Sequence, residues 1–309
     1  MRKLLVKILL LIIPVIAFFA LAIAIRPANY LTKNLIYAQN DKDSLLAKTN
    51  KPRIVIIGGS NASFGLDSQI LKDSLKLNPV NMSIHGSIGL KYMLRNALRF
   101  IRKNDIVVVS PEYQQFYEDN ADGKKELLTI IFDVSPDTRH LLDFKQCISL
   151  LKSVPDYCVE KFGPFAYQRH KHDTVETGIY GKLSYNSYGD ACKHWGVPRS
   201  PVMPMAIDGE LNETVFVLLN DFRKQTELKQ AKLFITFPGY QDMSFNQSIP
   251  EINMIEKRLR ADSFVLLGTP ERYKMPDSLM FDTPYHLTYP GVKLRTNLLV
   301  ADLKKNLHN

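Results

Sequence analysis

The sequence predicts an α/β protein, a three-layer α/β/α sandwich around a five-stranded parallel sheet, preceded by one N-terminal transmembrane helix. Short apolar runs, typical of strands buried on both faces, alternate with amphipathic segments of helical period. Strands that alternate with helices in this way favour a parallel sheet covered by helices on both sides. The N-terminal helix is predicted from an uncharged apolar run at residues 8–25.

The strands are expected at residues 54–57, 79–84, 106–109, 232–237 and 264–267. The helices between and after them are expected at residues 67–75, with Asp67 as the N-cap, and at residues 90–101, 210–229, 252–259 and 290–307. Residues 112–205 show little sustained period, and we interpret them as a large insertion with some helices, forming a lid or recognition surface.

The N-terminus predicts export of the main domain. Arg2, Lys3 and Lys7 precede the apolar run, which favours a cytoplasmic N-terminus and an extracytoplasmic domain. The length of the run favours a retained signal anchor, whereas the small residues at positions 20–24 leave a cleavable signal peptide open. The predicted organisation is a cytoplasmic flank and anchor at 1–26, a juxtamembrane stalk at 27–51 and the main domain at 52–309.

Composition narrows the function classes. The net charge of +9 over 309 residues is spread along the chain, without zinc-finger spacing or an RNP-like motif, so nucleic-acid binding is not expected. A basic surface suits an anionic polymer or a membrane face. The three cysteines, Cys147, Cys158 and Cys192, leave at least one thiol free in a monomer and allow one disulfide, and the sequence does not say which residues would pair.

Ser60 is the first candidate catalytic residue. It follows a predicted strand and Gly58-Gly59, which let the backbone turn sharply and leave room for a substrate near the main chain. The backbone N–H groups of such a turn can face an oxyanion. An ordinary strand-to-helix turn is the alternative, since Gly, Ser and Asn are common there for conformational reasons.

Asp282 and His286 form the second candidate group, on a segment that leads into the last helix. A carboxylate can orient an imidazole and stabilise its charged form while the ring takes a proton from a serine hydroxyl. A solvated turn is the alternative. Both groups are expected at the carboxyl edge of the sheet, where active sites of α/β proteins collect.

In this order, the motifs resemble the SGNH (GDSL-like) hydrolase superfamily, whose fold is flavodoxin-like. Gly-Gly-Ser60-Asn-Ala-Ser resembles its first block, Asn81-Met-Ser-Ile-His-Gly86 its second, and Asp282-Thr-Pro-Tyr-His286-Leu its last. The resemblance spans about residues 52–111 and 230–305 and implies a Ser60–His286–Asp282 triad. It also implies an oxyanion site formed by the backbone N–H groups of Ser60 and Gly86.

The sequence departs from the family at two points. The third block normally supplies an asparagine to the oxyanion site, but here the strand ends Val-Ser110-Pro-Glu112-Tyr113, so Asn61 or Ser110 is a candidate substitute. The usual aspartate lies three residues before the histidine, whereas Asp282 lies four before His286. Glu112 and Tyr113 follow the third strand and are expected to border the site as substrate-binding residues.

A membrane-anchored domain of this kind resembles, more narrowly, the bacterial proteins of polysaccharide O-acylation. That resemblance implies a serine esterase or acyltransferase acting on acyl esters, especially O-acetyl esters, of a cell-envelope or secreted polysaccharide. It also implies a site at the outer face of the bacterial plasma membrane, beside a multi-pass membrane acyltransferase. The rival hypothesis is a catalytically silent module that binds glycan or serves as a scaffold partner of such an acyltransferase.

No metal or cofactor is expected. His170 and His172 are two imidazoles without an evident third ligand, which favours an exposed basic loop over a metal site. The aromatic residues Tyr180, Tyr185, Tyr188 and Trp195 in the insertion can stack on sugar rings or pack the insertion itself, and the sequence leaves both open.

Overall fold

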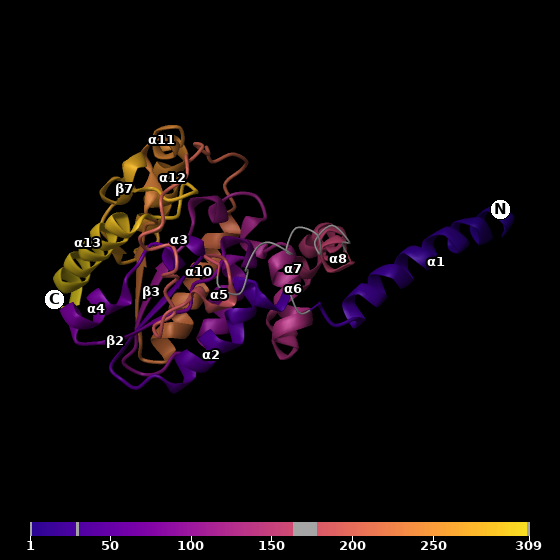
Figure 1. The fold of residues 1–309 in the computed structure, drawn as a ribbon, viewed down its shortest axis with the longest axis horizontal. Coiled ribbons are helices and arrows are strands. Elements are labelled where there is room, and N and C mark those ends of the chain that lie inside the picture. Colours follow the sequence, from indigo (N-terminus) through magenta and orange to yellow (C-terminus); the bar gives the residue numbers. More distant parts are fainter. Residues whose placement is uncertain (1, 29–30, 163–177, 308–309) are drawn as a thin grey trace.

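The computed structural model describes residues 2–28, 31–162 and 178–307. Its centre is a parallel sheet in the order β2-β1-β3-β4-β6 (Figure 1). The strands are β1 (Arg53–Gly58), β2 (Asn78–Asn81), β3 (Ile106–Ser110), β4 (Lys232–Thr236) and β6 (Leu266–Leu267). The predicted five-stranded parallel sheet is therefore confirmed, with second and fifth strands that are shorter than expected.

Helices cover both faces of the sheet, as the alternating pattern predicts. Ile54 and Ile56 of β1 belong to the core cluster that also contains Leu299 of α13 (Tyr289–Leu307). Val55 and Ile57 belong to the cluster that also contains residues of α5 (Leu90–Leu98) and α10 (Glu213–Leu228). Successive strand residues point to opposite faces, so an unbroken apolar run buries side chains on both. The main helices are α4 (Ser68–Leu75), α5 (Leu90–Leu98), α10 (Glu213–Leu228), α12 (Ile249–Ala261) and α13 (Tyr289–Leu307).

The described residues of the region predicted as an insertion, 112–162 and 178–205, contain three short α-helices. They are α6 (Lys125–Thr129), α7 (Phe144–Leu150) and α8 (Val154–Phe162). These helices share a second core cluster with Leu35, Ile36 and Ala22, which come from before β1. His170 and His172 lie outside the described residues. Other short elements include β5 (Tyr240–Gln241), α11 (Asp242–Asn246) and β7 (Lys274–Met275).

Residues 27–51, expected as a stalk, differ from that prediction. They contain α2 (Gln39–Lys48), whose Leu46 is fully buried in the main core. Lys42 is also buried, and its ammonium donates hydrogen bonds to the backbone carbonyls of Asn81, Ser83 and Gly189. The sequence did not predict that this segment packs on the domain, because its buried residues include polar ones. Lys42 is the example, since it is buried by bonding to backbone carbonyls.

The segment predicted as a membrane anchor forms α1 (Arg2–Ala24), which projects away from the domain (Figure 1). Its end nearest the domain packs on α8, where Ala22 is buried. Among the described helices, none combines the length and apolar character needed to cross a bilayer, so the structure does not support the transmembrane part of the prediction.

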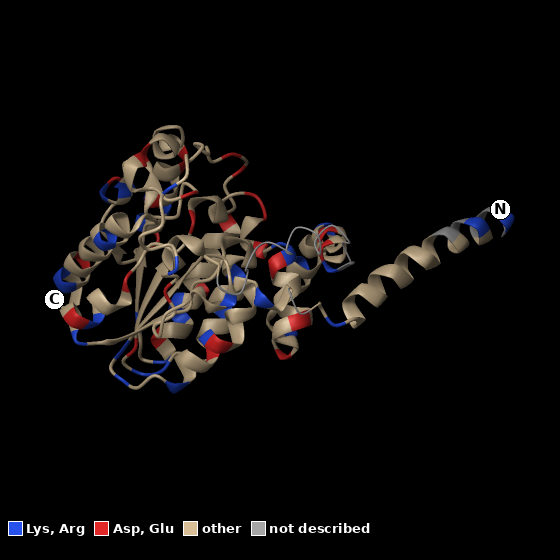
Figure 2. Ribbon diagram, viewed as in Figure 1, with Lys and Arg blue, Asp and Glu red and all other residues tan. Residues whose placement is uncertain are grey.

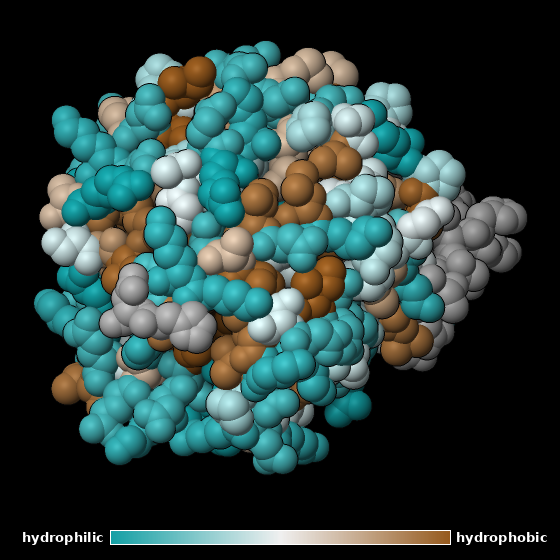
Figure 3. Space-filling model, turned by 90° about the vertical axis from the view of Figure 1, so that its left-hand side faces the viewer, coloured by the Kyte–Doolittle hydropathy of each residue, from teal (hydrophilic) through white to brown (hydrophobic). Residues whose placement is uncertain are grey.

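Charged residues of both signs are distributed over the domain, whereas the middle of α1 carries none (Figure 2). On the face of the molecule that Figure 3 shows, hydrophilic side chains predominate, with apolar ones between them. Cys147, Cys158 and Cys192 are all free thiols in the structure.

Candidate active site

Ser60 lies where the sequence predicts, separated from β1 by Gly59 alone, at the start of α3 (Ser60–Ser63). Its backbone geometry depends on the glycine before the turn. A Cβ atom on Gly58 would lie 2.6 Å from the carbonyl oxygen of Ser110, so only glycine lets the ends of β1 and β3 approach this closely. Ser60 itself is 8% exposed, which places its hydroxyl at the rim of the buried interior.

The hydroxyl of Ser60 contacts Glu112 rather than a histidine. Ser60 Oγ donates to Glu112 Oε1 over 3.2 Å, and the backbone N–H of Asn61 donates to the same oxygen over 3.1 Å. A Cβ atom on Gly59 would lie 2.4 Å from Oε1, and one on Gly86 would lie 2.1 Å from Oε2. The carboxylate therefore fills a small space bounded by two glycines, an amide and the serine hydroxyl.

Asp282 and His286 form a hydrogen-bonded pair. Asp282 Oδ1 lies 2.9 Å from His286 Nδ1, which leaves Nε2 as the ring atom able to exchange a proton with a reacting group. Thr283 Oγ1 accepts the backbone N–H of His286 over 3.1 Å and shapes the turn between the two residues. The four-residue spacing therefore places the carboxylate within hydrogen-bonding distance of the imidazole, and Thr283 stabilises the turn between the two residues.

Electrostatics favour an ionised Asp282. Burial raises the pKa of its carboxyl group, but the hydrogen bond and positive charge of His286, with the hydroxyl of Tyr180, outweigh burial and hold the pKa below its ordinary value. Tyr180 donates to Asp282 Oδ2. Burial, together with the neighbouring charge of Asp282, raises the pKa of the Tyr180 phenol, which stays protonated as a donor.

Phe64 joins the serine turn to the histidine turn. Its ring stacks on His286 with centroids 4.3 Å apart, and its backbone N–H donates to the carbonyl of Ser60 over 2.8 Å. Within the part of the chain that the structure describes, no hydrogen bond links Ser60 Oγ to His286. The predicted triad residues are therefore neighbours through Phe64, with the serine hydroxyl turned toward Glu112.

His194 is a second imidazole near this pair. Its Nε2 lies 3.0 Å from the carbonyl of Leu287, and its ring contacts Phe64 with centroids 5.1 Å apart. Burial, and to a lesser degree the charge of His286, lowers its pKa to about 4. His194 therefore stays neutral at neutral pH and forms no ion pair with Asp282, which is bonded to His286.

Arg295 supports the site from within the protein. Its side chain is buried, and it donates to the carbonyl of Asn61, to Asn61 Oδ1 over 3.0 Å and to Ser110 Oγ over 2.8 Å. The Asn61 side chain, predicted as an oxyanion donor, is thus committed to the interior. Of Asn61, only the backbone N–H faces the site.

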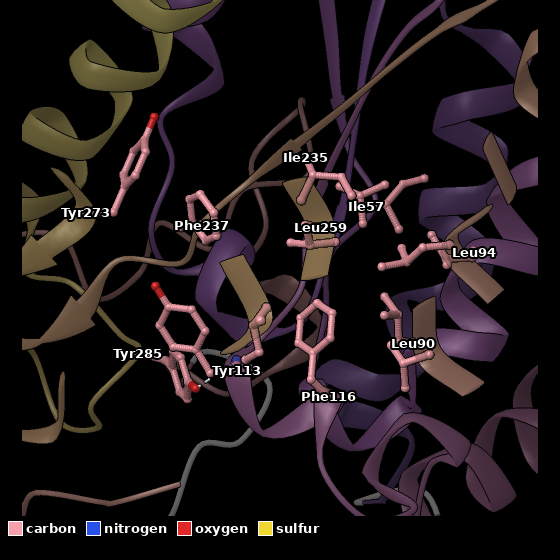
Figure 4. Packing of buried hydrophobic residues seen from close by; sticks show 14 of the residues in the cluster. Ile57, Leu90, Leu94, Tyr113, Phe116, Ile235, Phe237, Leu259, Tyr273 and Tyr285 are labelled. Carbon is pink, nitrogen blue, oxygen red and sulfur yellow. Dashed lines mark hydrogen bonds between the residues drawn. The ribbon is translucent and has the colours of Figure 1, made fainter. Parts of the chain in front are cut away.

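Tyr113 does not fulfil its predicted role in substrate binding. Its side chain is 1% exposed and packs edge-on against Tyr240, with ring centroids 5.3 Å apart. Figure 4 shows it beside Tyr285, whose hydroxyl accepts the backbone N–H of Tyr113. Tyr113 is a core residue because the chain turns inward directly after Glu112.

A pocket of about 250 Å³ adjoins the site. Tyr180 lines it and also bonds Asp282, and His85, which lines it too, directly precedes Gly86. Tyr37, Lys125 and Lys161 also contribute to its walls. Of the other insertion aromatics, Tyr185 is partly buried against the core cluster of α6 and α8, and Trp195 stacks on Tyr289, so these two pack the domain.

Phe64 and Arg295 were not predicted as site residues, whereas Tyr180 was expected only to stack on a sugar ring or to pack the insertion. Arg295 alone carried a signal, because it shares a helical face with Val292 and Leu299, and a charge on an apolar face indicates a buried partner. Among the described residues, no cluster of His, Cys, Asp or Glu is arranged to hold a metal. No protein-family model matches the chain, and no curated protein matches it either.

Proposed function

We propose that this protein is a serine esterase or acyltransferase of the SGNH type. The hydrogen bond of 2.9 Å between Asp282 and His286, on a ring stacked against the turn that follows Ser60, carries the proposal. An imidazole oriented by a carboxylate beside a turn serine is the arrangement that activates a hydroxyl for acyl transfer.

The proposed reaction has two stages. Ser60 Oγ turns from Glu112 toward His286, attacks the acyl carbonyl and passes its proton to Nε2. The N–H groups of Ser60, Asn61 and Gly86 stabilise the oxyanion, and His286 then protonates the leaving alcohol. Water or a sugar hydroxyl attacks the acyl-enzyme, with His286 as the base, and releases a carboxylic acid or a new ester.

The proposed substrates are acyl esters, especially O-acetyl esters, of a cell-envelope or secreted polysaccharide. The pocket beside Tyr180 supports this, because its tyrosine, lysine and acidic side chains combine ring surfaces with hydrogen-bonding groups suited to sugars. Attachment to the outer face of a bacterial plasma membrane, beside a multi-pass acyltransferase, remains part of the proposal. The exposed apolar side chains of α1 support it.

One observation favours the rival function of a catalytically silent partner of such an acyltransferase. The hydroxyl of Ser60 is bonded to Glu112, so the resting site lacks a nucleophile aligned with its base. A silent module would bind the polymer through the pocket beside Tyr180 and leave the chemistry to its partner.

Acetate release separates the two functions. The purified full chain and its Ser60→Ala variant are incubated with O-acetylated alginate, and free acetate is measured over time. The enzyme hypothesis predicts release by the wild type and a loss of at least about a hundredfold in the variant. Equal rates for the two proteins, or polymer acylation in producing cells that is unaffected by Ser60→Ala, would favour the silent module.

A further inference from the structure

The contacts of Glu112 define a pocket with a distinct chemistry. One carboxylate oxygen accepts from Ser60 Oγ and from the backbone N–H of Asn61, and the other lies against Gly86. Side chains at positions 59 or 86 would collide with the carboxylate, since both virtual Cβ atoms fall within 2.4 Å of it. The two glycines and the amide form a cradle that has the size of a carboxylate.

The same atoms are those that would receive an acyl oxygen. The Asn61 N–H points at the position beside Ser60 Oγ, where negative charge would develop during attack on an ester. While Glu112 holds that N–H, a substrate carbonyl cannot occupy the same position. A fixed carboxylate there would also repel the oxyanion, because two negative charges would lie side by side in a partly buried site.

The cradle stays in place when the carboxylate moves. Glu112 is anchored through its backbone, whose N–H donates to Gln115 Oε1 over 3.0 Å, while Gln115 Nε2 donates to the carbonyl of Gly86 over 3.0 Å. Arg295 holds Asn61 by its carbonyl and its side chain. Rotation of the Glu112 side chain releases its bonds to Ser60 Oγ and to the backbone N–H groups of Asn61 and Gln115. The side chains of Gln115 and Arg295 still hold Gly86 and Asn61, so the walls of the cradle keep their support.

We infer that the space beside Ser60 is a binding site for a small carboxylate, and that Glu112 is its internal occupant and keeps Ser60 unreactive until displaced. The inference rests on the proposed function, because it assigns this space to the acyl group. Glu112 takes the place of the carboxylate product that hydrolysis of an acetyl ester leaves. A role for Glu112 as the base of Ser60 is less favourable, since a carboxylate is a far weaker base than imidazole.

The test measures how fast a fluorophosphonate probe labels Ser60, by intact mass, in the wild-type full chain and in the Glu112→Ala and Glu112→Gln variants. Glu227→Gln is the matched control, since Glu227 is exposed on α10 and removed from the site. We expect labelling at least about tenfold faster in Glu112→Ala and an intermediate rate in Glu112→Gln. Sodium acetate, but not neutral acetamide, should slow the labelling of Glu112→Ala, because acetate refills the cradle.

The outcomes separate this inference from the proposed function. Labelling that is no faster in Glu112→Ala or in Glu112→Gln than in the wild type would overturn the inference and leave the serine chemistry standing. Faster labelling of Glu112→Ala that acetate and acetamide leave equally unchanged would overturn the carboxylate site. If Ser60 stays unlabelled in every folded variant, both the inference and the proposed function fail. If Glu112→Ala does not fold, the comparison with Glu112→Gln decides.

Discussion

At the scale of single residues, the charge of Arg295 is the least expected feature of the site. A guanidinium on the apolar face of α13 is buried, and burial lowers its pKa to about 10, so it remains charged at neutral pH. Its partners are mostly uncharged oxygens of Asn61, Ser110 and Phe237. The charge is therefore used to fix the backbone after Ser60.

Replacing Arg295 with Met should lower the free energy of unfolding by about 3 kcal/mol, because several buried acceptors lose their donor. Urea unfolding followed by circular dichroism measures the change. Arg260→Met is the control, since Arg260 is half exposed and pairs with Glu256 on the surface of α12. The control should stay within about 0.5 kcal/mol, and a similar loss in both variants would contradict this account of Arg295.

His194 predicts a pH dependence of stability. Its folded pKa of about 4 lies below the ordinary value of 6.5, so between these values the unfolded chain binds a proton that the folded chain does not. Stability from this group is complete above about pH 6.5 and is lost as the pH falls toward about 4.

The His194→Gln variant tests the sign of this effect. Between about pH 7 and about pH 4, the wild type should lose about 3 kcal/mol more of its free energy of unfolding than the variant. Urea unfolding at both pH values gives the difference. Parallel losses in the two proteins would show that His194 is not the titrating group.

Residue-level prediction from sequence succeeded where the partners are close along the chain. Asp282 and His286 are four residues apart, and their contact follows from one turn. Tyr180 is 102 residues from Asp282, so no local pattern links them. Glu112 was expected at the border of the site, but its position against Gly59 and Gly86 depends on the packing of three segments.

At the scale of elements, strands and long helices followed the hydrophobic pattern, whereas α2 did not. Only a few of its side chains face the core, and Lys42 takes the place of an apolar residue by bonding three backbone carbonyls. The packing of such a helix cannot be predicted from its own sequence, because it depends on carbonyls from β2 and from the segment near Gly189.

Leu46 tests whether α2 is part of the fold. Its side chain is fully buried, so Leu46→Ala should lower the free energy of unfolding by about 3 kcal/mol through loss of contacts and a residual cavity. Leu228→Ala, at a leucine that is 77% exposed, should change it by less than about 0.5 kcal/mol. Thermal and urea unfolding of both variants provide the measurement. If Leu46→Ala left the free energy of unfolding unchanged, α2 would contribute nothing to the fold, as expected of a stalk.

At the scale of the whole molecule, the domain and α1 differ in how much of their apolar surface is exposed to solvent. The domain buries its large side chains between layers, whereas Leu10, Ile13 and Ile16 of α1 are more than half exposed. Isolated exposed apolar residues are normal, but a continuous set on one projecting helix indicates an apolar partner. Our proposal of membrane attachment assigns that partner.

Membrane attachment through α1 predicts that the full chain floats with lipid vesicles in a density gradient. Replacing Leu10, Ile13 and Ile16 together with Ser should shift most of the protein to the soluble fraction, because each replacement removes about 2 kcal/mol of transfer free energy. The same exchange at the exposed Leu228 should have no effect. Equal flotation of all three proteins would contradict attachment through α1.

In the proposed function, Ser60 is an acyl-transfer nucleophile and His286 is its base. The most direct measurement is fluorophosphonate labelling of the wild type, Glu112→Gln and His286→Ala, read by intact mass and peptide mapping. We expect a single adduct on Ser60, formed slowly in the wild type, faster in Glu112→Gln and not at all in His286→Ala. No adduct on Ser60 in folded wild type and Glu112→Gln, or an adduct that forms unchanged in His286→Ala, would contradict the proposed function.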